Sequence, residues 1–165
     1  MNEQDFSYLT SLAQQLGTHM VERGMTLATA ESCTGGWIAK CITDVAGSSS
    51  WFERGFITYH NRAKVEMLGV STQTLRLHGA VSQEVATEMV SGALAGSCAD
   101  LAVAVTGIAG PGGGTPDKPV GTVWIAWRRR DHAPHIQRHL FAGDREQVRA
   151  QAVAQALEGL LENLG

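Results

Sequence analysis

The chain has 165 residues, of which 44% are hydrophobic and 18% charged, and its mean hydropathy is close to zero. This composition is typical of a compact folded domain and excludes an intrinsically disordered chain. The net charge of -3 provides no basic field for nucleic acid, and the basic run at residues 128–130 is interpreted as a solvated strand end.

Cysteine usage and the N-terminal residues indicate where the protein works. Cys33, Cys41 and Cys98 form no CxxC pair, which favours a reducing compartment. Residues 1–5 are polar and acidic and lack the features of an export signal, and no apolar run approaches the roughly 20 residues that cross a bilayer. We therefore expect a soluble, cytoplasmic protein that spans no membrane and binds no nucleic acid.

The first element is predicted to be an amphipathic helix, because apolar residues recur at steps of three and four over residues 6–20 before Gly24 stops it. Residues 25–30 follow as a short buried strand, and residues 37–43 have helical character. The polar segment between them, residues 31–36, is therefore expected at a strand-to-helix turn.

The middle of the chain is predicted to be mostly helical. After a second strand over residues 52–60, Asn61 is expected to cap a short helix that carries Lys64. A further helix signal ends at Gly79, and Ser82 is expected to cap the next helix.

The last third begins with residues 101–105, which are almost purely apolar, as in a central strand. They lead into a long loop that opens with the glycine-rich residues 106–114, and such loops are often functional. Two strands follow back to back, over residues 120–127 and 135–141.

A final helix begins at Asp144, which forms a capping-box pattern with Gln147. Helices before, between and after the strands imply a sheet covered on both faces, and the last two strands imply an antiparallel edge. Residues 1–165 are therefore predicted to form a single α/β domain, a three-layer α/β/α structure with a mixed sheet of about five or six strands.

Ser32 is the first candidate nucleophile, because the unpaired N–H groups of a strand-to-helix turn favour negative charge. Serine needs a base, and a desolvated Lys64 could take its proton, with Tyr59 relaying the proton or holding the amine. The structural alternative is that Ser32 only caps a helix and Lys64 is exposed. The pattern alone favours that alternative.

Other side chains offer rival chemistry. Cys33 could be the nucleophile, since a thiol at a helix N-terminus can have a depressed pKa, and Thr34 carries another hydroxyl. The structural alternatives are that Cys33 is an ordinary buried cysteine and that Thr34 only caps a helix. The six histidines lack metal-binding spacing, so no metal is predicted.

Two features suit an anionic ligand. The glycines of residues 107–114 allow a close backbone approach and an anion-binding nest, although a flexible connection explains them equally well. Arg145, the first residue of the last helix, adds a cation that suits a phosphate; its alternative is an ordinary surface residue.

The segment Ala-Glu-Ser-Cys-Thr-Gly-Gly at residues 30–36 resembles the family of CinA C-terminal domains, which includes stand-alone nicotinamide mononucleotide deamidases. Further motifs in the family's order cover nearly the whole chain. They are residues 47–49, 55–59, Asn61 and Lys64, residues 79–82, 106–111, 118–123 and 143–145. The resemblance also implies that the larger N-terminal domain of full-length CinA proteins is absent.

The resemblance implies an amidohydrolase that needs no cofactor and converts nicotinamide mononucleotide to nicotinate mononucleotide and ammonia, in pyridine-nucleotide salvage. By position, the family's catalytic serine, lysine and tyrosine fall on Ser32, Lys64 and Tyr59. His60 departs from the family, which commonly has serine there. The residues expected to bind substrate are Glu31, Cys33, Thr34, Thr106, Gly107, Gly110 and Arg145.

Two other functions stay open at this point. One is a hydrolase of another small amide or nucleotide-like substrate, and the other is a catalytically silent module that binds a pyridine nucleotide. The presence of both Ser32 and Lys64 favours an enzyme. A homo-oligomer, with a dimer favoured, is expected from the glycine-rich loop near an exposed sheet edge.

Overall fold

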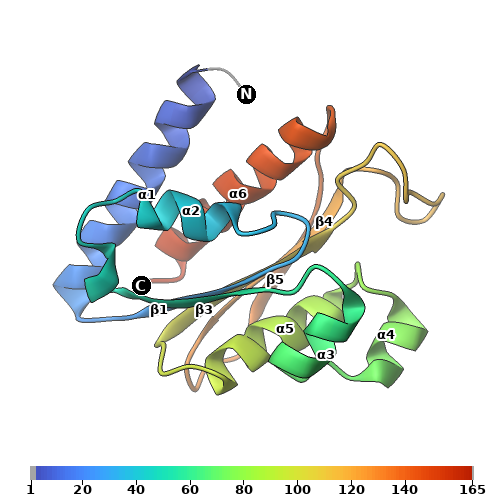
Figure 1. Ribbon diagram of the computed structural model, residues 1–165, viewed down its shortest axis with the longest axis horizontal. Coiled ribbons are helices and arrows are strands. Elements are labelled where there is room, and N and C mark those ends of the chain that lie inside the picture. Colours follow the sequence, from blue (N-terminus) through green and yellow to red (C-terminus); the bar gives the residue numbers. More distant parts are fainter. Residues whose placement is uncertain (1–2, 165) are drawn as a thin grey trace.

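The computed structural model describes the backbone of residues 3–164 and the side chains of residues 6–164, arranged as a sheet between two layers of helices (Figure 1). The strands are β1 (Leu27–Glu31), β2 (Phe52–Ile57), β3 (Leu101–Gly107), β4 (Thr122–Arg129) and β5 (His135–Leu140). The helices are α1 (Glu3–Arg23), α2 (Trp37–Thr43), α3 (Asn61–Leu68), α4 (Thr72–His78), α5 (Gln83–Ala95) and α6 (Arg145–Glu162), with a 3-10 turn at η1 (Ser48–Ser50).

The sheet has the strand order β2-β1-β3-β4-β5. Strand β1 runs parallel to both β2 and β3, whereas β4 is antiparallel to β3 and to β5. The predicted three-layer α/β structure with a mixed sheet and an antiparallel edge is therefore confirmed. Because β1, β2 and β3 are parallel, their carboxyl ends meet at one edge of the sheet.

Side-chain size divides the core into two unequal layers. Along β3, Leu101, Val103 and Val105 face the layer of α1, α2 and α6, while Ala102 and Ala104 face the layer of α3, α4 and α5 (Figure 1). Successive side chains of a strand point to opposite faces, so this alternation leaves little bulk beneath α5. Helix α5 can therefore pack closely on the sheet.

The sequence misplaced two local features. His60, not Asn61, caps α3, because its backbone is extended and its Nδ1 accepts the Arg62 N–H at 3.1 Å. The basic run is not simply a solvated strand end: Arg130 donates to the carbonyl oxygens of the loop before β3, Ala99 among them at 2.6 Å. Within the described part of the chain, no helix is long and apolar enough to cross a membrane.

Close packing at Gly92 fixes α3 against α5. A Cβ at Gly92 would overlap the carbonyl oxygen of Leu68, the last residue of α3. A backbone atom cannot move aside as a side chain can, so glycine is required for this approach. The contact matters for function because α3 carries Lys64.

We expect Gly92→Ala to destabilise the fold by about 1–3 kcal/mol through overpacking, although alanine is the better helix former. Urea unfolding measures the loss. Gly112→Ala is the control, since a Cβ there meets no atom within 4 Å. Equal stability of the two variants would contradict the close helix contact.

Candidate active site

Ser32 lies in the turn between β1 and α2, at the carboxyl edge of the parallel strands. Its N–H donates to the carbonyl oxygen of Val105 at 3.0 Å, so the chain still follows β3 at this point. The Gly35 N–H then donates back to the Ser32 carbonyl oxygen at 3.0 Å and closes the turn. Gly35 and Gly36 have φ of 62° and 97°, which other residues rarely adopt.

Glu31 anchors the start of α2. Its carboxylate accepts the N–H groups of Gly36, Ile38 and Ala39 at 3.1, 3.0 and 2.9 Å, and the residue is 1% exposed. A carboxylate suits a helix N-terminus, where unpaired N–H groups carry partial positive charge. Glu31 therefore holds the Ser32 turn in place and does not line the pocket of Ser32, and its contact with substrate stays a prediction.

Lys64 reaches Ser32 from the other side of the sheet edge. Its Nζ lies 3.0 Å from Ser32 Oγ and donates to the carbonyl oxygen of Thr58 at 2.9 Å. The side chain is 1% exposed, and within residues 6–164 no carboxylate forms an ion pair with it. Burial lowers the pKa of Lys64, since water no longer solvates the charged form.

A pocket of about 240 Å³ opens above this pair. It is lined by Ser32, Cys33, Tyr59, Asn61, Lys64, Ala80, Val81, Thr106, Gly107, Ala109 and Arg145. The structure thus gathers most of the predicted site residues from four separate stretches of the chain. Asn61, expected only as a cap, joins them as a pocket residue.

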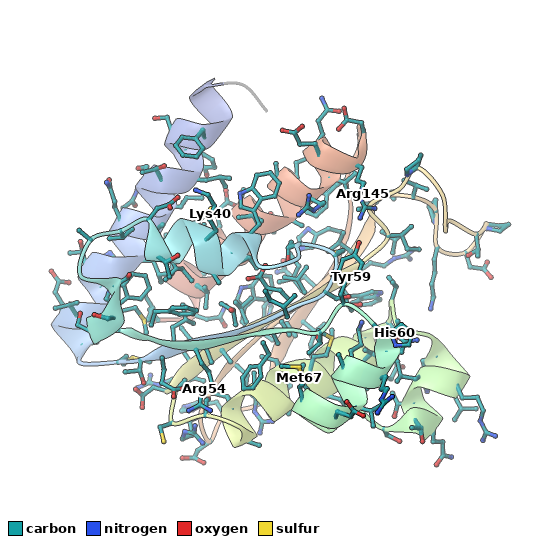
Figure 2. The ribbon with its side chains drawn as sticks, viewed as in Figure 1. Lys40, Arg54, Tyr59, His60, Met67 and Arg145 are labelled. Carbon is teal, nitrogen blue, oxygen red and sulfur yellow. The ribbon has the colours of Figure 1, made fainter. Side chains whose placement is uncertain are left out.

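Arg145 and Tyr59 both line the pocket, and Figure 2 shows the two labelled side chains on the same side of the molecule. Arg145 donates from Nη2 to Tyr59 Oη at 2.6 Å and from Nη1 to the Gly110 carbonyl oxygen at 2.8 Å. Tyr59 is 59% exposed, and no hydrogen bond among the described residues joins it to Lys64. The predicted contact between Tyr59 and the Lys64 amine is thus absent here.

The glycine-rich segment forms an ordered wall. Thr106 Oγ1 donates to the Ala80 carbonyl oxygen at 2.8 Å. A Cβ at Gly107 would lie 2.6 Å from the Val123 side chain and 3.1 Å from Cys33 Sγ, so glycine is needed there. Gly110 has a φ of 84° and its carbonyl oxygen is held by Arg145. Specific contacts, and not only flexibility, account for these glycines.

Cys33 and Thr34 differ in what they offer. Burial raises the pKa of the Cys33 thiol to about 12, so the thiolate that nucleophilic attack requires is scarce at neutral pH. Thr34 is fully buried and its side chain does not line the pocket of Ser32, so its contact with substrate stays a prediction. The residues described contain no group of three potential metal ligands.

These features define a class of protein: a three-layer α/β domain with a buried serine–lysine pair where the carboxyl ends of parallel strands meet. Residues 9–164 match the CinA C-terminal domain, and the chain belongs to this family. The family predicted from the motifs is confirmed.

Similar proteins agree with this assignment. The chain is 55% identical over 154 residues to nicotinamide-nucleotide amidohydrolase PncC of Escherichia coli K12, covering 93% of each. It is 53% identical to PncC of Pseudomonas putida, covering 93% of this chain and 96% of the relative. The crystal structure of competence/damage inducible protein CihA from Agrobacterium tumefaciens superposes with a TM-score of 0.92 at 46% identity, covering 94% of each chain.

Replacing the Glu31 carboxylate should loosen the nucleophile turn. We expect Glu31→Gln to lower the free energy of unfolding by about 2 kcal/mol, because a neutral amide cannot accept the three N–H groups as strongly as the charged carboxylate does. Urea titration measures this. Glu66→Gln, which removes an exposed carboxylate from an i,i+4 pair with Arg62, is the control; losses of the same size would contradict the anchoring role.

Proposed function

We propose that the protein is an amidohydrolase that converts nicotinamide mononucleotide to nicotinate mononucleotide and ammonia, a salvage reaction of pyridine nucleotides. The observation that carries this proposal is the buried contact of 3.0 Å between Lys64 Nζ and Ser32 Oγ. The names of the relatives supply the substrate class, since they are called nicotinamide-nucleotide amidohydrolases.

In the proposed mechanism, Lys64 is the general base. A buried amine without a carboxylate partner favours the neutral form, whose lone pair accepts the Ser32 hydroxyl proton. The Thr58 carbonyl oxygen accepts one amine hydrogen and keeps the lone pair directed at Ser32. Ser32 thereby gains nucleophilicity without a histidine.

The reaction then runs in two halves. Ser32 Oγ attacks the carboxamide carbon, giving a tetrahedral oxyanion, and Lys64 returns the proton to the leaving nitrogen, so that ammonia departs from a nicotinoyl ester. In the second half, Lys64 takes a proton from water, whose oxygen attacks the ester carbon. The tetrahedral intermediate then expels Ser32 Oγ, to which Lys64 returns the proton, and the released carboxylic acid loses its own proton to solvent to give the carboxylate product. Both halves use the same base, and the proton count closes.

Arg145 is the proposed phosphate ligand. Its guanidinium lines the pocket and lies at the first residue of α6, where unpaired helix N–H groups add positive potential. In this role Tyr59 Oη and the Gly110 carbonyl oxygen orient the cation. Thr106, Gly107 and Cys33 would contact the pyridine ribonucleoside along the pocket wall.

The buried pair also favours an enzyme over a silent binding module. Removing the Lys64 amine from water costs solvation free energy. A site that only binds a ligand gains nothing in return from placing that amine within hydrogen-bond reach of a serine. A cytoplasmic location and a homodimer stay predictions from the sequence; light scattering of the purified protein tests the dimer.

Ammonia release from nicotinamide mononucleotide tests the proposal. We expect Ser32→Ala and Lys64→Met each to lower kcat by about 10³-fold or more, as when a nucleophile or its base is removed from a hydrolase. Ser50→Ala and Lys40→Met, which change exposed residues outside the pocket, should retain turnover. A wild-type protein that binds the nucleotide without releasing ammonia would instead be the silent module.

The pH dependence of kcat/KM tests Lys64 as the base. Protonated Lys64 cannot accept a proton, so the rate should be low at acid pH and rise as pH increases through the Lys64 pKa. Because burial lowers that pKa, this rise should be complete at a lower pH than an exposed lysine would require. A profile with no acid limb would remove Lys64 from the role of base.

A further inference from the structure

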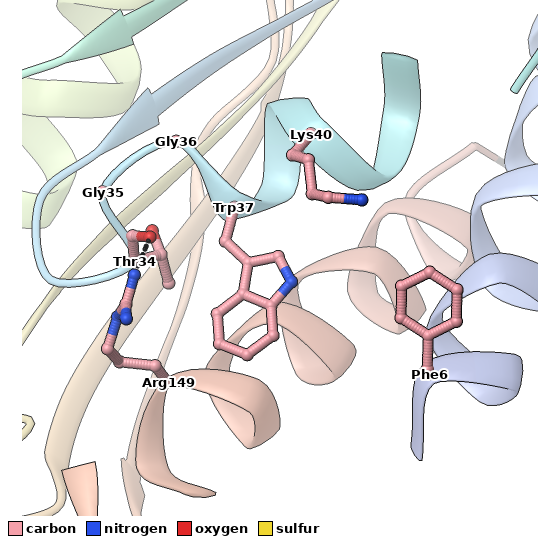
Figure 3. A pocket seen from close by; sticks show the side chains of 7 residues that line it. All are labelled: Phe6, Thr34, Gly35, Gly36, Trp37, Lys40 and Arg149. Carbon is pink, nitrogen blue, oxygen red and sulfur yellow. Dashed lines mark hydrogen bonds between the residues drawn. The ribbon is translucent and has the colours of Figure 1, made fainter. Parts of the chain in front are cut away.

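Arg149 grips the Ser32 turn from outside the active-site pocket. It lies on α6, four residues after Arg145, and lines a second pocket of about 390 Å³ that Ser32 and Lys64 do not line. Its Nε donates to the Cys33 carbonyl oxygen at 3.0 Å, and its Nη2 donates to the Thr34 carbonyl oxygen at 2.9 Å. Figure 3 shows the guanidinium against Thr34, with Trp37 nearby.

Trp37 restricts where the Arg149 guanidinium can go. The central carbon of the guanidinium lies 5.2 Å from the centroid of the indole ring, within range of a cation–π interaction. Two hydrogen bonds and a ring therefore hold the group. Such a fixed geometry is what is needed to set the orientation of a backbone segment.

The backbone N–H groups of the turn divide into used and unused donors. Those of Ser32, Gly35 and Gly36 donate to Val105, Ser32 and Glu31 respectively, at 3.0, 3.0 and 3.1 Å. Within the described chain, no hydrogen bond to another residue uses the N–H of Cys33 or of Thr34. These two successive donors directly follow the nucleophile.

The orientation of the Cys33 carbonyl group fixes where the N–H of Thr34 points. In a planar trans peptide, the C=O of one residue and the N–H of the next are antiparallel. Since the Cys33 carbonyl oxygen accepts from Arg149, the Thr34 N–H is directed away from the Arg149 guanidinium.

We propose that the N–H groups of Cys33 and Thr34 form the oxyanion hole of Ser32, and that Arg149 is the positioning residue that holds them there. The inference rests on the proposed amidohydrolase function, and it adds a residue that touches neither the substrate nor the reacting atoms. Oxyanion contacts strengthen as charge develops in the transition state. Replacing Arg149 should therefore lower kcat and change KM little.

The proposal requires arginine and not merely a cation. A guanidinium presents two donors in one rigid plane, matched to two neighbouring carbonyl oxygens, whereas the single ammonium group of lysine does not reproduce that fork. Arg149→Lys therefore keeps the positive charge but no longer holds the Cys33 and Thr34 carbonyl oxygens together. Arg130→Lys is the matched control, because Arg130 also donates to backbone carbonyl oxygens, those of Leu94, Ser97 and Ala99, at a distance from the pocket.

The test measures steady-state kinetics of nicotinamide mononucleotide deamidation and thermal unfolding for both variants and for Arg149→Ala. We expect Arg149→Lys to lower kcat by about 10- to 100-fold, approaching the loss of one oxyanion donor, with KM changed less than about twofold. Arg130→Lys should lower the midpoint of unfolding at least as much and keep kcat. Equal kcat in wild type and Arg149→Lys would overturn the proposal, as would a kcat loss that Arg130→Lys shares.

A second readout separates this proposal from the choice of substrate. A fluorophosphonate phosphonylates an activated serine and also develops negative charge on oxygen, so its reaction with Ser32, followed by mass spectrometry, needs no nucleotide. Slower labelling of Arg149→Lys than of Arg130→Lys supports the oxyanion role even where nicotinamide mononucleotide is not turned over. Labelling at equal rates, or no labelling of wild-type Ser32, contradicts it.

Discussion

The arrangement of this protein depends on one constraint, the burial of the Lys64 amine beside Ser32 without a carboxylate to neutralise it. Charging the amine in this position is costly, so the neutral form is favoured and the group becomes a base. Burial in turn requires α3 to lie tightly on the rest of the fold. Gly92 allows this by letting the end of α3 approach the backbone of α5.

The nucleophile turn is held by its backbone from two directions. Glu31 accepts N–H groups at the start of α2, and Arg149 donates to the carbonyl oxygens of the residues that follow Ser32. An anion thus takes the donors of the turn and a cation takes its acceptors. Neither Glu31 nor Arg149 contacts the N–H groups of Cys33 and Thr34, and these are the donors proposed to stabilise the oxyanion.

The sequence predicted the three layers, the mixed sheet and its antiparallel edge, because buried strands such as residues 101–105 are uniformly apolar and helices carry clear caps, as at Asp144. It also predicted that Ser32 and Lys64 belong to one site. Both follow strands of a parallel sheet, whose carboxyl ends must meet, and the family motifs singled out the same two residues.

The direction in which each side chain of a turn points was not predictable from the sequence. Glu31, Ser32 and Thr34 belong to one short segment, yet the Glu31 carboxylate accepts N–H groups at the start of α2, Ser32 lines the pocket and Thr34 is fully buried. The cap by His60 depends on a ring nitrogen whose orientation no pattern specifies. Arg149 was missed since its partners are backbone carbonyls more than a hundred residues away.

Titration of the Lys64 amine, followed through its side-chain NMR signal, tests directly whether Lys64 can act as the base. Lys64→Met assigns the signal by removing it. We expect Lys64 to lose its proton at a lower pH than an unperturbed lysine side chain does, because burial lowers its pKa. A Lys64 amine that titrates like an unperturbed lysine would contradict a neutral base beside Ser32.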